Sequence, residues 1–282
     1  MMTTLISTDE LAARLDDPAL VLLDIRHDLA SPKDWGEREY AKAHIPGAVF
    51  LHLDRDLSAP TNGVNGRHPL PSPEVCAALF GRIGIDDTKQ VVTYDQGSSA
   101  FASRLWWMLR WLGHDAVAVL DGGFAKWARE ARSVTTDVRE SAATTFKVAR
   151  VAPTVNSTGV AESLSRHTLL LVDARPPERF RGEVEPMDPV AGHIPGAVNR
   201  PASQNLTSEG VFKPAARLRA EFAALLGGRP HGDVVHHCGS GVTACQNILA
   251  MEIAGLPGTR LFPGSWSEWV SNPARPVAKA QR

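Results

Sequence analysis

The chain of 282 residues contains an internal repeat that spans most of its length. Four blocks occur twice in the same order: LVLLDIR at 20–26 and LLLVDAR at 169–175, HIPGA at 44–48 and 193–197, VVTYD at 91–95 and VVHHC at 234–238, and VLDGGFAKW at 119–127 and LFPGSWSEW at 261–269. Because order and spacing are both kept, chance is a poor explanation. We predict two homologous domains, residues 1–135 and 153–282, joined by a polar linker at 136–152.

Each repeat alternates strand-like and helix-like segments. Residues 20–25 and 169–173 are short apolar runs of the buried-strand type. Helical patterns follow at 73–84, at 99–112, which is apolar nearly all round, and at 242–254. This alternation predicts the α/β class, with a mainly parallel sheet flanked by helices in each domain. In such sheets ligands bind beyond the carboxyl ends of the strands.

Charge and cysteine content narrow the function classes. Thirty basic and 31 acidic residues give a net charge of -1, which argues against a nucleic-acid binder driven by bulk charge. No apolar run approaches the roughly 20 residues that span a bilayer, so we expect no membrane partner. The N-terminal segment lacks the pattern of a secretory signal. Three cysteines form neither a disulfide framework nor a metal-binding spacing. We therefore expect a cytoplasmic protein without metal or cofactor.

The repeat alignment places Asp95 opposite Cys238. Both residues end a predicted strand, and both precede a glycine-containing turn and a helix. In the second copy the turn reads CGSGVT at 238–243, and its two glycines allow backbone amides to converge on one point. The positive end of the following helix faces the same point. Amides and a helix N-terminus stabilise a thiolate, so the sequence predicts a reactive, exposed sulfur at Cys238.

Other interpretations compete for the remaining cysteines and histidines. Free cysteines are mostly small buried hydrophobes, and we expect Cys76 and Cys245 to be of this kind. The same interpretation is open for Cys238, but it leaves the loop glycines unexplained. Adjacent histidines at 236–237 point to opposite faces of a strand, which argues against a metal site there. The repeated His44 and His193 either brace the turn beside Pro-Gly or, for His44, assist the cysteine.

Two tandem copies, the first without a nucleophile and the second ending in a cysteine loop, resemble the rhodanese-type sulfurtransferases. The resemblance covers nearly the whole chain and rests on the two HIPGA blocks and on three further segments: DARPPERF at 173–180, CGSGVT at 238–243 and PGSWSEW at 263–269. It implies an N-terminal rhodanese-like domain at 1–135 and a catalytic one at 153–282. The loop CGSGVT is similar to that of the 3-mercaptopyruvate branch, whereas the thiosulfate branch typically has basic residues there.

The resemblance also implies residue roles. Cys238 would be the nucleophile that becomes a persulfide, and Arg179 would bind the anionic end of the donor. Ser240 would assist the chemistry, supported by His44 and Asp34 of the first domain. The amides of the loop would hold the substrate sulfur: Gly239, Gly241, Val242 and Thr243. One departure concerns a second substrate arginine of the mercaptopyruvate branch, because Met187 stands about where that arginine is expected. Arg181 and Arg104 are the candidates to substitute for it.

The choice of sulfur donor can be argued from leaving groups. Thiosulfate releases the sulfite dianion, which cations near the loop would favour, and residues 239–243 contain none. 3-Mercaptopyruvate releases an enolate that needs a proton, and the hydroxyl of Ser240 is suited to deliver one. Ser240 could instead be only a helix cap. We predict transfer from 3-mercaptopyruvate to cyanide, a small thiol or thioredoxin, with thiosulfate as the alternative donor.

Two further classes of protein compete with a sulfurtransferase as the interpretation of the cysteine loop. A cysteine phosphatase needs an arginine six residues after its cysteine, and that position is Ala244. This rival is therefore disfavoured. A non-catalytic carrier that receives a persulfide and hands it to a partner is harder to separate from an enzyme by sequence. The retained loop and Arg179 favour turnover.

Overall fold

The computed structural model describes residues 1–138 and 141–279 and divides into two compact units. The first unit consists of Met1–Ala59, Pro71–Ala152 and Ser208–Phe212; the second consists of Pro60–Leu70, Pro153–Thr207 and Lys213–Arg282. Each unit therefore corresponds to one sequence repeat, except for two short segments that pack with the other unit. The segment Pro60–Leu70 matters for function, because it belongs to the unit that contains Cys238.

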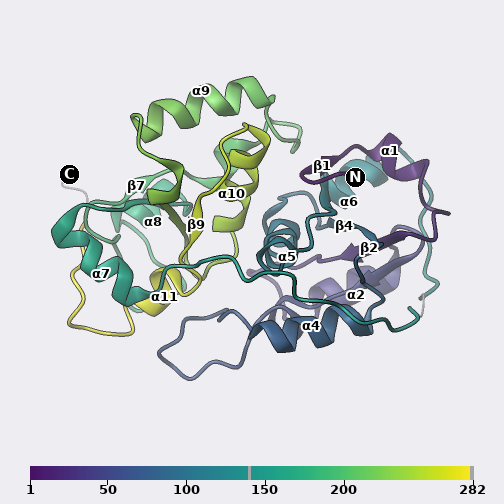
Figure 1. Ribbon diagram of the computed structural model, residues 1–282, viewed down its shortest axis with the longest axis horizontal. Helices are drawn as coiled ribbons and strands as arrows, with labels where there is room; N and C mark the ends of the chain where they lie inside the picture. The colour runs from purple at the N-terminus through teal and green to yellow at the C-terminus, as the bar shows by residue number, and fades with distance from the viewer. Residues whose placement is uncertain (139–140, 280–282) are drawn as a thin grey trace. The chain divides into compact units, whose positions relative to one another are not determined.

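The first unit is built on a five-stranded parallel sheet in the order β1-β5-β4-β2-β3. Its strands are β1 (Leu5–Ile6), β2 (Leu20–Asp24), β3 (Ala48–Phe50), β4 (Gln90–Tyr94) and β5 (Val117–Leu120). Its helices, drawn from purple to teal in Figure 1, are α1 (Thr8–Ala12), α2 (Trp35–Lys42), α3 (Leu53–Asp56), α4 (Pro73–Arg82), α5 (Ala100–Trp111) and α6 (Gly123–Arg129).

Local sequence explains where these elements begin and end. The hydroxyl of Ser72 accepts a hydrogen bond from the amide of Val75 and Pro73 occupies the first turn, so α4 begins as the sequence predicts. Helix α5 is apolar on nearly every face because it packs on β4 and β5 within the core. The predicted linker makes ordered contacts with this unit: Thr144 donates its amide to Gly81, and Ala149 to Leu112.

The second unit has a four-stranded parallel sheet in the order β7-β6-β8-β9. The strands are β6 (Leu170–Asp173), β7 (Val198–Asn199), β8 (Val234–His237) and β9 (Arg260–Leu261). Around the sheet lie α7 (Ser157–Arg166), α8 (Pro177–Arg181), α9 (Ala215–Leu226), α10 (Ala244–Ile253), α11 (Ser265–Trp269) and the 3-10 turns Ala202–Asn205 and His231–Asp233. Helix α10 packs on β8, β9 and α9. Figure 1 shows it next to α9 and β9. The predicted α/β class with parallel sheets is confirmed.

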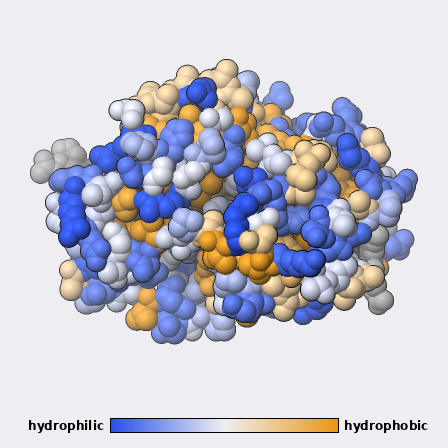
Figure 2. Space-filling model, viewed as in Figure 1, coloured by the Kyte–Doolittle hydropathy of each residue, from blue (hydrophilic) through white to orange (hydrophobic). Residues whose placement is uncertain are grey.

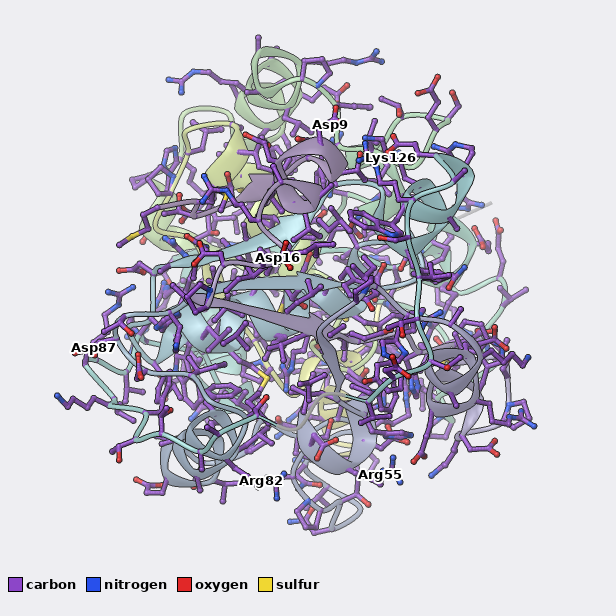
Figure 3. The ribbon with its side chains drawn as sticks, turned by 90° about the vertical axis from the view of Figure 1, so that its right-hand side faces the viewer. Asp9, Asp16, Arg55, Arg82, Asp87 and Lys126 are labelled. Carbon is purple, nitrogen blue, oxygen red and sulfur yellow. The ribbon has the colours of Figure 1, made fainter. Side chains whose placement is uncertain are left out.

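The surface carries mostly polar side chains. Hydrophilic residues cover most of the face drawn in Figure 2, and the large exposed apolar side chains of the described residues are mainly single valines. Charged side chains of the first unit, such as Arg82 and Asp87, are exposed (Figure 3). Within the described ranges, no helix has both the length and the apolar character needed to cross a membrane.

Candidate active site

The cysteine loop joins the carboxyl end of β8 to the start of α10. The amide of Cys238 donates to Ser265 Oγ at 3.1 Å, and its carbonyl accepts from the amide of Trp266 at 3.0 Å. Gly241 has φ +78°, and a Cβ there would lie 2.1 Å from the carbonyl oxygen of Pro263. Only glycine therefore fits at this position. The loop is held in place by its backbone contacts with α11 and the residues just before it.

The predicted exposure of Cys238 is wrong, because the residue is only 3% exposed. Charged and polar groups nevertheless lie close to its loop. A Cβ built on the next residue, Gly239, would lie 2.7 Å from Nη2 of Arg67 and 3.6 Å from Nη1 and Nη2 of Arg179. Two guanidinium groups therefore border the backbone immediately after the cysteine. Positive charges at this distance stabilise an anion, so the surroundings differ from those of a cysteine packed purely in an apolar core.

The loop serine is paired with a histidine that the sequence analysis did not single out. Oγ of Ser240 lies 2.7 Å from Nδ1 of His68, and both residues are buried. His68 comes from Pro60–Leu70, the segment that packs with the second unit. An imidazole within hydrogen-bond distance can take or return the hydroxyl proton. Ser240 and His68 can therefore exchange a proton at the serine hydroxyl, and Ser240 comes two residues after Cys238 in the chain.

Two carboxylates hold the guanidinium groups beside the loop. Glu185 Oε1 lies 2.6 Å from Nη2 of Arg179, and Asp188 Oδ2 lies 3.4 Å from the same nitrogen. Asp188 also forms an ion pair with Nη1 of Arg67. The thioether of Met187 lies 3.9 Å from Nη1 of Arg179 and 4.0 Å from Nη2 of Arg67. Arg67 thus lies beside the position where the sequence comparison expected an arginine and found Met187.

The strand before the cysteine carries two buried histidines. Burial lowers the pKa of His236 to about 3, and burial also lowers the pKa of His237, whose Nε2 lies 3.9 Å from Asp173. Both rings are therefore neutral near pH 7. Across residues 1–138 and 141–279, no cluster of three or more His, Cys, Asp or Glu side chains is arranged to hold a metal ion.

The structure gives His44 and His193 equivalent surroundings. Nδ1 of His44 lies 2.8 Å from the carbonyl oxygen of Tyr40, and Nδ1 of His193 lies 2.7 Å from that of Phe180. Each imidazole also stacks on the ring of the same residue, Tyr40 or Phe180. Both histidines therefore brace their turns, as one of the two sequence interpretations expected.

The two first-domain residues expected to assist Ser240 make their described contacts within the first unit. Nε2 of His44 lies 3.1 Å from the carbonyl oxygen of Asp137, so both ring nitrogens have partners within the first unit. Asp34 is exposed and pairs with Arg38 on α2. Their catalytic roles stay predictions. The remaining loop residues lie where the sequence placed them, between β8 and α10: Gly239, Gly241, Val242 and Thr243.

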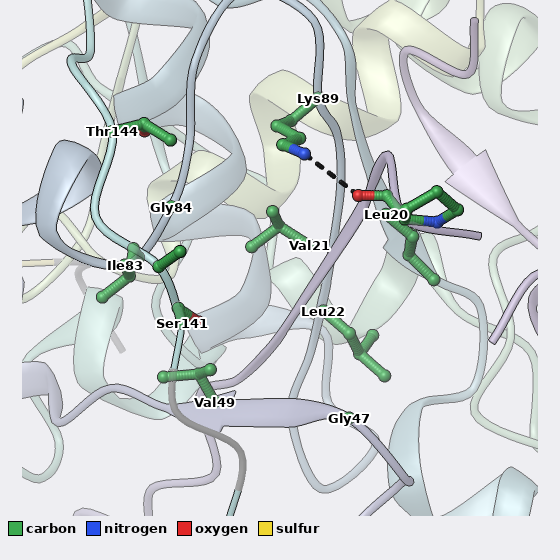
Figure 4. Close-up of a pocket in the computed structure, with 12 residues that line it drawn as sticks. Leu20, Val21, Leu22, Gly47, Val49, Ile83, Gly84, Lys89, Ser141 and Thr144 are labelled. Carbon is green, nitrogen blue, oxygen red and sulfur yellow. Dashed lines mark hydrogen bonds between the residues drawn. The ribbon is translucent and has the colours of Figure 1, made fainter. Parts of the chain in front are cut away.

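The first unit contains a pocket that is a second candidate for an active site. It has a volume of about 160 Å³ and is lined largely by β2 and the segment around Ser141, with the ammonium group of Lys89 donating to the carbonyl of Pro18 at 3.0 Å (Figure 4). Its described walls are mainly apolar and include no cysteine, histidine or carboxylate. The ammonium group of Lys89 and the hydroxyl of Thr144 both donate to backbone carbonyls, so neither is paired as a nucleophile with a base.

Comparison with known proteins decides the family. The model of the rhodanese-like domain matches residues 7–130 and again residues 158–272. The chain belongs to the rhodanese-like family. A protein of Pseudomonas aeruginosa named "Probable 3-mercaptopyruvate sulfurtransferase" is 48% identical over 277 residues, which cover 97% of each chain. The thiosulfate sulfurtransferase of Gallus gallus is 36% identical over 240 residues, 82% of this chain and 80% of that one.

Solved structures agree with the sequence matches. The crystal structure of SseA from Escherichia coli, a 3-mercaptopyruvate sulfotransferase, superposes with a TM-score of 0.80 at 34% identity and covers 94% of this chain and 99% of that one. The predictions of two tandem rhodanese-like domains and of a sulfurtransferase enzyme are confirmed. Such enzymes use small-molecule sulfur donors and thiol acceptors.

Sequence reasoning missed His68 and Arg67 for an identifiable reason. They lie between the second and third repeat blocks, in a stretch outside all four repeated blocks. Nothing in the local pattern shows that this stretch packs beside a loop 172 residues further along the chain. The one available signal is an adjacent arginine and histidine in an otherwise neutral loop, Asn62–Leu70.

Proposed function

We propose that this chain transfers a sulfane sulfur from 3-mercaptopyruvate, through a persulfide on Cys238, to a thiol or cyanide acceptor. The observation that carries the choice of donor is the 2.7 Å contact between Ser240 Oγ and His68 Nδ1. A pyruvate leaving group needs a proton and a sulfite leaving group does not, so a hydroxyl–imidazole pair beside the nucleophile favours the former. The identity to the Pseudomonas aeruginosa relative supports the same donor.

The first half-reaction loads the enzyme. The Cys238 thiolate attacks the thiol sulfur of 3-mercaptopyruvate, a new S–S bond forms, and the C–S bond breaks with its electron pair passing to the pyruvate enolate. Ser240 gives its proton to the enolate carbon, and His68 returns a proton to the serine oxygen. The products are pyruvate and a persulfide at Cys238 with the donor's sulfur outermost.

The second half-reaction unloads the enzyme. An acceptor thiolate attacks the outer sulfur, the S–S bond breaks, and its electron pair returns to Cys238 as a thiolate. Small thiols and a reduced thioredoxin are the acceptors we propose. The cysteines of the chain, all of them free thiols, are consistent with the reducing cytoplasm that we propose as its location.

Two arginines are available for the anionic end of the donor. Arg179 is the residue expected from the sequence, and Arg67 supplies a second guanidinium on the same side of Gly239. The side chain of Arg67 is 25% exposed and that of Arg179 is 13% exposed, and Nη2 of Arg67 lies beside Gly239. A planar guanidinium can bind both oxygens of a carboxylate. These residues therefore orient the carboxylate of 3-mercaptopyruvate while its sulfur faces Cys238.

The same two arginines favour thiosulfate as the second candidate donor, because cations stabilise departing sulfite. The experiment that separates the donors is a comparison of kcat/KM for 3-mercaptopyruvate and thiosulfate with cyanide as acceptor. Ser240→Ala is expected to lower turnover of 3-mercaptopyruvate by about 10²-fold and to affect thiosulfate much less, since only the first reaction needs the proton. Ser165→Ala, on the exposed face of α7, is the control for loss of a hydroxyl.

Two results would contradict this proposal. Equal losses with both donors in Ser240→Ala would reject the proton-delivery role of the serine. No turnover of either donor by the folded wild-type protein would favour the persulfide carrier over the enzyme.

A further inference from the structure

A pair of buried carboxylates lies directly behind the two guanidinium groups of the site. Asp188 pairs with both Arg67 and Arg179, whereas Glu185 pairs with Arg179 and, at 3.3 Å, with Arg175. Both carboxylates have side chains only 3% exposed. Their positions are fixed by the chain, since the amides of residues 187 and 188 donate to Glu185 Oε1 at 3.1 and 3.2 Å.

These carboxylates offset the positive charge that faces the loop. Arg67 and Arg179 contribute two positive charges, and Asp188 and Glu185 contribute two negative ones. The charge of Arg175, which also contacts Glu185, is offset by Asp173 at 2.7 Å. Met187, between the guanidiniums, adds no charge. A donor anion therefore enters a site with arginine hydrogen-bond donors but little net positive charge. Fixed charges in a partly buried setting are weakly screened, so the balance acts on the donor directly.

We propose that Asp188 is a specificity-determining residue that selects a donor with one negative charge over a donor with two. The inference rests on the proposed function. The Coulomb energy between a fixed charge and a ligand is proportional to the charge of the ligand. Asp188 therefore opposes dianionic thiosulfate about twice as strongly, in free energy, as it opposes the monocarboxylate of 3-mercaptopyruvate. Asp188 is also the carboxylate that contacts both guanidiniums, so its charge lies at the anion-binding end of the site.

The test compares both donors in Asp188→Asn at low ionic strength and constant pH. The free-energy effect of removing the charge is expected to be twice as large for dianionic thiosulfate as for 3-mercaptopyruvate, so the fold-change in kcat/KM for thiosulfate is the square of that for 3-mercaptopyruvate. If kcat/KM for 3-mercaptopyruvate rises about threefold, kcat/KM for thiosulfate is expected to rise about tenfold. The matched control is Glu183→Gln, which removes the same charge from a side chain that is 49% exposed and paired with Arg181. The control is expected to leave the ratio of the two donors unchanged.

A purely structural role for Asp188 would change both donors by the same factor, and that result would overturn the proposal. So would a shift of the ratio toward 3-mercaptopyruvate. Asp188→Ser provides a second, smaller replacement whose hydroxyl can still accept from a guanidinium, and it is expected to shift the ratio in the same direction. Loss of folding in both variants would assign Asp188 to stability and overturn the selectivity role.

Failure of this inference is distinguishable from failure of the proposed function. Wild-type protein that does not turn over 3-mercaptopyruvate contradicts the function itself. Wild-type protein that does, combined with an unchanged donor ratio in the Asp188 variants, contradicts only the role of Asp188.

Discussion

The loops after β4 and β8 leave equivalent points of two copies of one fold, but one begins with Asp95 and the other with Cys238. The Asp95 carboxylate accepts hydrogen bonds from the amides of the turn and of the start of α5: Gly97 and Ser99 at 2.9 Å, Phe101 at 3.0 Å and Ala102 at 3.3 Å. Burial raises the pKa of Asp95, and these amides act in the opposite direction. The converging amides of the first loop thus already have an acceptor, the carboxyl group of Asp95.

The second loop presents a thiol at the same point. Its first residue has no carboxylate to fill the turn, and the neighbouring groups are Ser240, His68 and two arginines. The comparison indicates how one fold gives a structural copy and a reactive copy. In the first copy the Asp95 carboxyl group accepts the hydrogen bonds of the amides between strand and helix, whereas in the second copy a cysteine leaves these amides available to stabilise a reacting sulfur. Each prediction below tests one side of this difference.

The largest expected effect is on activity. Cys238→Ala should lower turnover with either donor by at least about 10³-fold, because no other group can carry the sulfur. Its free energy of unfolding should change by less than about 1 kcal/mol, since the side chain is small. Steady-state kinetics and urea unfolding measure the two quantities. Substantial remaining turnover would remove Cys238 from the mechanism.

Asp95→Ala should give the opposite pattern. Four amides lose their acceptor in a buried loop, so the free energy of unfolding should fall by about 3 kcal/mol or more. Turnover per folded molecule should stay at the wild-type value. Urea unfolding and kinetics below the unfolding transition provide the measurements. A stable variant would show that the amides do not depend on the carboxylate.

Gly241→Ala tests the backbone of the reactive loop. Positive φ costs about 1 kcal/mol for alanine, and the contact with Pro263 adds about 1–3 kcal/mol of strain. The control is Gly228→Ala, where φ is +82° and no atom lies within 4 Å of the added Cβ. The first variant should lose stability and turnover, and the control should lose only about 1 kcal/mol. Equal behaviour of the two would contradict the close packing of the loop.

The smallest effect concerns pH. The pKa of His236 is lowered to about 3 by burial, whereas its counterpart in the first unit, Thr93, does not titrate. The unfolded chain binds a proton at this histidine below about pH 6.5 and the folded chain does not. The stability from His236 is therefore complete above pH 6.5 and falls by on the order of 2 kcal/mol between pH 7 and pH 5.

Hydrogen exchange, corrected for the intrinsic effect of pH, can follow β4 and β8 separately. Protection of β8 should fall more than that of β4 as the pH is lowered from 7 to 5, and His236→Thr should reduce the difference. Equal losses in both strands, or no response to the substitution, would contradict the pH dependence assigned to His236.

The sequence was sufficient for most of the fold and for the nucleophile. The repeated blocks predict two parallel sheets, and the glycines around Cys238 identify the loop because their role is local. The partners of the loop could not be found in the same way. His68 and Arg67 reach the loop only through tertiary packing of Pro60–Leu70. His44 was predicted to assist the cysteine because a histidine suits proton transfer, and the sequence does not show what surrounds it.

The most direct test of the account is mass spectrometry of the wild-type protein after brief exposure to 3-mercaptopyruvate without an acceptor. The account predicts an addition of about 32 Da, the mass of one sulfur atom, on the peptide that contains Cys238, and its loss when cyanide is added. No such addition should occur at Cys76, because burial raises the pKa of its thiol to about 11, or at Cys245, whose thiol donates to the carbonyl oxygen of Gly241 at 3.4 Å. A sulfur found on either of those residues, or pyruvate release with unmodified Cys238, would contradict it.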